Sequence, residues 1–137
     1  MSNQDQPKFL NEWKQSALKD WGRILIMLSE NDPEAASFFL QQSLEKFLKA
    51  YLLVNGWKLK KIHELDTLLN EACVQQPELE AFRDLCEEVS AFYIANRYPP
   101  LVRLEITCEE VISKCREAAD LLQRLFPDEA RSLILPE

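Results

Sequence analysis

The sequence predicts an all-α fold: a compact bundle of about five helices, mostly antiparallel between neighbours. Apolar residues recur at steps of three and four along most of the chain, which is the period of one helix face. Only two glycines occur among the 137 residues, whereas sheets and phosphate-binding loops depend on glycine-rich turns. Prolines and short polar breaks separate the periodic stretches, so we expect short connections.

The first predicted helix runs from about residue 8 to residue 29, and the second begins at Asp32-Pro33. Asp32 is the expected N-cap, and Pro33 suits the first helical position. Asn55-Gly56 is a typical helix end, so it predicts where the second helix stops. The apolar stripes of the two helices are Trp13, Ala17, Trp21, Ile24 and Leu28, and then Leu40, Leu44, Phe47, Tyr51 and Val54.

Three further helices are predicted after a short basic connection at residues 57–62. The third spans about residues 63–74, and Gln76-Pro77 ends it because a residue before proline avoids helical geometry. The fourth spans about residues 77–95 and stops before Pro99-Pro100. The fifth follows Thr107, which is the expected N-cap of a capping box with Glu110.

Length and composition favour one globular domain over residues 1–137, with a core at about residues 8–127 and a flexible tail at about residues 128–137. No purely apolar run is longer than Ala50–Val54, which is far short of the about 20 residues that span a bilayer. The first residues are polar and unlike a signal peptide. We therefore expect a cytoplasmic protein without a membrane segment.

Charge and cysteine content narrow the chemistry further. A net charge of −7 argues against a general nucleic-acid coat but leaves room for a local basic pocket. The four cysteines form no CxxC pair, and the chain has one histidine, so we expect neither a zinc site nor any other metal or cofactor. Reduced cysteines packed in the core are the favoured interpretation.

Three places concentrate polar residues that the bundle does not require. Gln42, Lys46 and Lys49 form one polar line along the second helix. This line is either a solvated stripe with a Glu45–Lys49 ion pair or part of a ligand site. His63 begins the third helix, where it is either a helix-terminus residue or a functional group that needs a partner.

The third place is Arg97-Tyr98, directly before Pro99-Pro100. A guanidinium suits phosphate or carboxylate, and a tyrosine ring can stack on a base. The alternative is a helix stop with Tyr98 packed beneath it and Arg97 paired to an acid. The candidate ligand-binding residues are Gln42, Lys46, Lys49, His63, Arg97 and Tyr98.

In their order and spacing, these residues resemble the HEPN family over Trp13 to about Leu125. The elements that carry the resemblance are Trp13, Ala17 and Asp20, Phe38 through Gln41-Gln42, Glu45-Lys46-x-x-Lys49-Ala50, Gly56, His63-x-Leu65, Tyr93 and Arg97-Tyr98-Pro99. The resemblance implies a helical bundle like a nucleotidyltransferase substrate-binding subunit. It also implies a homodimer, a small nucleotidyltransferase partner, and in some members a toxin that cleaves RNA.

The ribonuclease members of that family carry an arginine with a histidine roughly four to six residues later, which supplies proton transfer. Here Arg97 is followed by Tyr98-Pro99-Pro100-Leu101-Val102-Arg103, without a histidine. An arginine stabilises phosphate charge but is a poor proton shuttle, because it stays protonated. We therefore expect no catalytic residues.

The resulting expectation is a non-catalytic HEPN protein that binds a nucleotide or another phosphate-bearing ligand, or partners a small nucleotidyltransferase, as in a toxin–antitoxin pair. Two alternatives stay open. One is a divergent metal-independent ribonuclease that uses His63 across the bundle or a dimer interface, with RNA as its substrate. The other is a purely structural interaction protein, which a large exposed apolar patch without a ligand-sized pocket would indicate.

Overall fold

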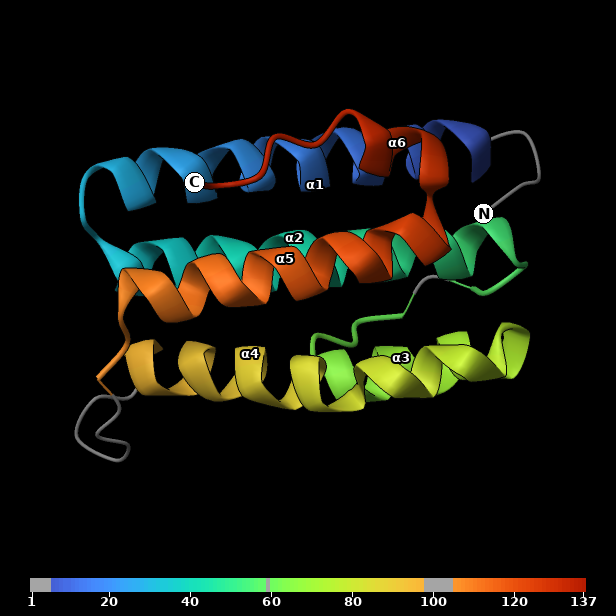
Figure 1. The fold of residues 1–137 in the computed structure, drawn as a ribbon. Coiled ribbons are helices and arrows are strands. Elements are labelled where there is room, and N and C mark those ends of the chain that lie inside the picture. The colour runs from blue at the N-terminus through green and yellow to red at the C-terminus, as the bar shows by residue number, and fades with distance from the viewer. Residues whose placement is uncertain (1–5, 59, 98–104) are drawn as a thin grey trace.

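The computed structural model describes residues 6–58, 60–97 and 105–137, and these ranges contain helices and connections but no strand (Figure 1). This confirms the predicted all-α bundle. The α-helices are α1 (Gln6–Ser29), α2 (Pro33–Val54), α3 (Leu65–Gln75), α4 (Arg83–Arg97), α5 (Cys108–Leu125) and the short α6 (Pro127–Arg131). A 3₁₀ helix, η1 (Pro77–Phe82), precedes α4. Over the described residues, no helix is both long and apolar enough to cross a membrane.

Helix α2 lies at the centre of the bundle. It contacts α1, α3, α4 and α5. Figure 1 shows α1 and the C-terminal segment along one side of α2 and α5, with α3 and α4 along the other. A helix with neighbours on several sides must bury more than one stripe, and this is why the sequence of α2 is apolar well beyond a single face.

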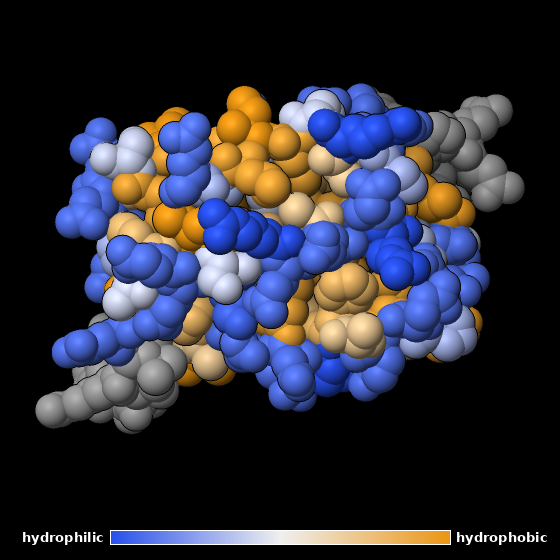
Figure 2. Space-filling view, viewed as in Figure 1, coloured by the Kyte–Doolittle hydropathy of each residue, from blue (hydrophilic) through white to orange (hydrophobic). Residues whose placement is uncertain are grey.

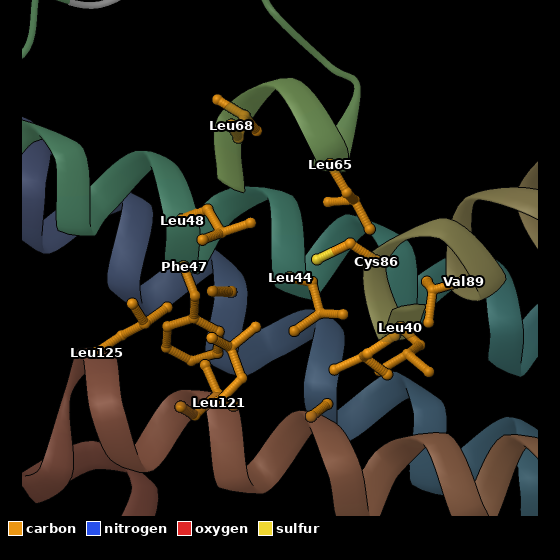
Figure 3. Packing of buried hydrophobic residues seen from close by; sticks show 14 of the residues in the cluster. Leu40, Leu44, Phe47, Leu48, Leu65, Leu68, Cys86, Val89, Leu121 and Leu125 are labelled. Carbon is orange, nitrogen blue, oxygen red and sulfur yellow. The ribbon is translucent and has the colours of Figure 1, made fainter. Parts of the chain in front are cut away.

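The hydrophobic core forms around α2. Figure 3 shows side chains of α3, α4 and α5 converging on the apolar residues of this helix. The labelled residues are Leu40, Leu44, Phe47 and Leu48 of α2, Leu65 and Leu68 of α3, Cys86 and Val89 of α4, and Leu121 and Leu125 of α5. Because this core surrounds α2, several polar residues on that helix are buried as well.

The turn between α1 and α2 has the predicted cap. Asn31 adopts a left-handed conformation (φ 58°), which reverses the chain. The Asp32 carboxylate then accepts a hydrogen bond from the Ala35 N–H at 3.1 Å. Pro33 takes the first helical position, where its missing N–H leaves no hydrogen bond unmade.

The end of α2 is also as predicted. Gly56 has a φ of 85°, a conformation that favours glycine. Its N–H donates to the Leu53 carbonyl at 3.2 Å, and the Trp57 N–H donates to the Leu52 carbonyl at 2.9 Å. These two bonds form a Schellman motif, which satisfies carbonyls that the helix end would otherwise leave open.

The C-terminal segment, residues 127–137, contains a short helix and contacts α1. Residues 127–131 form α6, and Lys14 of α1 pairs with Glu129 at 2.6 Å. The Trp21 indole N–H donates to the Ile134 carbonyl at 2.9 Å. Figure 2 shows apolar surface where Figure 1 places this segment along α1. The segment therefore has a docking site on α1, whereas its flexibility in solution stays a prediction.

Candidate functional site

A cavity of about 780 Å³ lies between α2, α4 and the residues that lead into α3. Its volume is within the range of small-molecule sites, roughly 300–1,000 Å³. Helix α2 and the entry to α3 supply most of the polar lining, which comprises Gln41, Gln42, Glu45, His63, Glu64 and Asp66. Helix α4 closes the opposite wall with Glu87, Ser90, Ala91, Tyr93 and Ile94.

Glu45 is the centre of a polar network at the base of this cavity. Its Oε2 atom lies 3.0 Å from the Lys49 ammonium and 3.1 Å from Nδ1 of His63. The side chains of Glu45 and Lys49 are 7% and 3% exposed, whereas that of His63 is 71% exposed. The Glu45–Lys49 ion pair is thus buried, whereas the His63 imidazole is the part of the network that reaches the surface.

Gln41 attaches the His63 segment to α2, and Gln42 is hydrogen-bonded to Gln41. The Gln41 amide nitrogen donates to Glu45 Oε1 at 3.4 Å and to the His63 carbonyl at 3.3 Å. The Gln42 amide donates to Gln41 Oε1 at 3.2 Å. These hydrogen bonds fix a segment that has no regular secondary structure, so the position of His63 depends on α2 rather than on α3 alone.

Helix α1 completes the surroundings of Lys49. The Lys49 ammonium lies 5.2 Å from the centre of the Trp13 ring, within the range of a cation–π contact. A buried lysine is costly unless its charge is compensated. Glu45 and Trp13 together supply that compensation from two helices.

Lys46 joins a second polar group, away from the cavity lining. Its ammonium lies 2.5 Å from Asp20, and the Arg23 guanidinium lies 2.7 Å from the same carboxylate. Asp20 is 2% exposed, so its charge needs these two cations. The cluster around Asp20 and the cluster around Lys49 thus connect α1 to α2 at two positions along these helices.

The structure brings together only part of the predicted ligand-binding set. Gln42 and His63 line the cavity. Lys46 and Lys49 do not line it, since Asp20 and Glu45 hold their ammonium groups. The backbone of Arg97 ends α4 one turn beyond Tyr93, and Tyr98 lies outside the described residues. The ligand-binding role of all six residues stays a prediction.

Sequence reasoning missed the wall that α4 contributes. Glu87, Ser90 and Tyr93 follow one another at steps of three, so they share one face of α4. The periodicity was sufficient to group them, but it did not show that this face lies opposite Gln42. Tyr93 also stacks on Phe38 of α2, with ring centres 5.9 Å apart, which fixes the two walls relative to each other.

Metal binding has no support in this region. Among residues 6–58, 60–97 and 105–137, no three His, Cys, Asp or Glu side chains form a group that could hold a metal ion. The cysteines are free thiols, with Cys86 and Cys115 buried in the core and Cys73 and Cys108 partly exposed.

Comparison with known families gives one decisive result. The HEPN domain family model matches residues 10–125. The chain belongs to the HEPN family. No curated protein and no solved structure gives a significant match. The family assignment therefore rests on the family model and on the residues described above.

The structure gives a physical reason for the pattern that marks this chain as a HEPN protein. Trp13, the Glu45–Lys49 pair and His63 come from three separate parts of the sequence but form one connected polar network. The pattern also contains Asp20 and Lys46, which form the second network. The HEPN pattern in this chain is thus largely the set of residues that holds α1, α2 and the His63 segment together.

Proposed function

We propose that this HEPN protein is a non-catalytic binding module whose cavity holds a nucleotide, or the substrate of a small nucleotidyltransferase partner. The cavity between α2 and α4 carries this proposal. It combines a ligand-sized volume with polar groups of fixed orientation and an apolar wall, which is typical of small-molecule sites. A solely structural protein would not need such a space.

The charges of the lining residues determine which part of a nucleotide would enter the cavity. The lysines of α2 already neutralise Asp20 and Glu45, so they leave little positive charge for a phosphate. Glu64, Asp66 and Glu87 line the cavity and repel phosphate oxygens. In this proposal the base and ribose occupy the cavity, and the phosphates extend outside it.

Isothermal titration tests ligand binding with adenosine, ATP, GTP and a short RNA as probes. Ser90→Trp fills the cavity from α4, whereas Ala81→Trp adds the same ring at an exposed position outside the cavity. We expect adenosine to bind the parent and Ala81→Trp proteins, and Ser90→Trp to lose at least about tenfold in affinity, or 1.4 kcal/mol. If no probe binds the correctly folded parent protein, the nucleotide proposal is wrong.

The nucleotidyltransferase partner and the homodimer are proposals that rest on the HEPN resemblance. The test is to examine the neighbouring genes for a small nucleotidyltransferase, to purify this protein together with any such enzyme, and to measure masses by light scattering. A stable complex supports the partner. A mass of one chain at micromolar concentration, with or without the transferase, contradicts both proposals.

One observation favours a second function, metal-independent RNA cleavage. Glu45 holds Nδ1 of His63, which directs the imidazole as a general base requires. Nε2 would take the proton of a ribose 2′-hydroxyl, the 2′-oxygen would bond to phosphorus, and the bond to the 5′-oxygen would break. Water would protonate that oxygen, leaving a 2′,3′-cyclic phosphate.

The ribonuclease alternative has a direct test. Purified protein should degrade a single-stranded RNA, and His63→Ala should abolish cleavage while its circular dichroism spectrum is unchanged. Equal cleavage by the parent protein and His63→Ala would exclude this function. The acidic lining of the cavity weakens attraction for RNA, which is why binding without cleavage is the preferred proposal.

A further inference from the structure

The hydrogen-bond donors of the cavity are mostly engaged within the protein. The two amide hydrogens of Gln41 point to Glu45 and to the His63 carbonyl. One amide hydrogen of Gln42 goes to Gln41. Nδ1 of His63 lies 3.1 Å from the Glu45 carboxylate, so this ring nitrogen is also engaged within the protein.

Three further carboxylates line the cavity, and they carry negative charge. Glu64 and Asp66 flank the start of α3, and Glu87 lies on the opposite wall from α4. The cationic side chains nearest in sequence on α2, Lys46 and Lys49, pair with other carboxylates.

Apolar surface accompanies these acceptors. Ala91, Tyr93 and Ile94 belong to the α4 wall, and the Ile94 side chain is 45% exposed. A ligand that combines a positive group, several N–H donors and a short apolar stem thus complements the cavity. Phosphate supplies neither the charge nor the donors.

We propose that the cavity between α2 and α4 seats an organic cation, a protonated alkylamine or a guanidinium, between the carboxylates of Glu64, Asp66 and Glu87. This inference rests on the proposed function and defines its ligand class, since the transferase substrate then carries the amine or guanidinium. The stem of the cation lies along Tyr93 and Ile94. The fixed hydrogen bonds of Gln41 hold the site in shape before the ligand arrives.

Calorimetry with agmatine and spermidine tests the cation, with adenosine as the uncharged probe. The variant Glu64→Gln/Asp66→Asn/Glu87→Gln removes three charges from the lining. Glu78→Gln/Asp84→Asn/Glu109→Gln removes the same charges from exposed positions outside it. We expect at least about a tenfold loss of agmatine affinity in the first variant and less than about a twofold change in the second.

Salt gives an independent measurement. Raising the ionic strength from about 0.05 M to 0.3 M should weaken agmatine binding to the parent protein and leave adenosine binding nearly unchanged, because salt screens charge pairs. If the lining and control variants lose equal affinity for agmatine, the loss comes from the net charge of the protein and not from the cavity. That result would overturn the inference.

The outcomes also separate this inference from the proposed function. Adenosine binding that Ser90→Trp abolishes, without binding of agmatine or spermidine, overturns the cation site and leaves the cavity as a ligand site. Binding of agmatine that Ser90→Trp abolishes supports both. If agmatine binds equally well to Ser90→Trp, the cation lies elsewhere and the inference is wrong.

Discussion

The Glu45–Lys49 ion pair has almost no contact with water, although both residues lie on a helix whose polar line looks solvated in sequence. Surface pairs at this spacing contribute little to stability. A buried pair behaves differently, because loss of one partner leaves the other charge unpaired in a medium of low dielectric constant. His63 and Trp13 add contacts that make this pair specific to the folded bundle.

Lys49→Met should lower the free energy of unfolding by about 3–5 kcal/mol, because it leaves the Glu45 carboxylate unpaired. Urea denaturation measures this change. Glu45→Gln/Lys49→Met removes both charges and should recover part of the loss. If the double variant is less stable than Lys49→Met, unpaired charge is not the cause.

Burial raises the pKa of Cys86 and of Cys115 to about 12, chiefly because the core does not solvate a thiolate. The unfolded chain loses these protons near pH 9, its ordinary value. Between pH 9 and 12 the native state therefore binds more protons than the unfolded state. Stability should fall as pH rises, by at most about 1.4 kcal/mol per pH unit for each thiol.

Denaturation at pH 8, 9 and 10 tests this dependence. The variant Cys86→Ala/Cys115→Ala lacks both thiols, so its stability should fall less steeply than that of the parent protein over the same range. Other groups titrate equally in both proteins and cancel in the comparison. Identical slopes would show that the two thiols do not contribute.

At the scale of single elements, side-chain caps mark where α2 and α5 begin. The Thr107 hydroxyl accepts a hydrogen bond from the Glu110 N–H at 3.1 Å, as Asp32 does for Ala35. These bonds are local, so the sequence predicted both caps. The start of α4 is different: the predicted helix at about residues 77–95 opens as the 3₁₀ helix η1, which buries Leu79 against the core.

Asp32→Ala should destabilise the protein by about 1 kcal/mol, because the Ala35 N–H loses its acceptor at the start of α2. Asp32→Asn keeps an acceptor oxygen and is the matched control, with an expected change of a few tenths of a kcal/mol. Thermal denaturation followed by circular dichroism measures both. Equal losses in the two variants would assign the effect to the charge of Asp32 rather than to its hydrogen bond.

At the scale of the whole molecule, the C-terminal segment closes one side of the bundle. Phe126 packs near Phe47 and Tyr51, and Ala130 and Leu133 pack against the core. Trp21 is 2% exposed and donates to Ile134. The last residues therefore cover part of α1 that the other helices leave open.

A chain that ends at residue 127 should lose about 1–3 kcal/mol of stability, because Trp21 becomes exposed and its indole N–H loses its acceptor in the protein. Tryptophan fluorescence and urea denaturation measure the change. Trp21→Phe keeps the apolar ring and removes the donor, so it isolates the hydrogen bond. A truncated protein with unchanged stability would show that the segment does not dock in solution.

The sequence by itself determined α1, α2, α3 and α5, the caps at Asp32 and Thr107, and the HEPN resemblance, because periodicity, N-caps and the Asn55-Gly56 stop act over a few residues. It also predicted that Glu45 pairs with Lys49. Only the tertiary structure decided that this pair is buried, that Asp20 engages Lys46, and that α4 faces Gln42 across a cavity. The physical reason is that helical phase orders side chains along one helix, whereas the facing partner and the solvent exposure depend on how helices distant in sequence pack together.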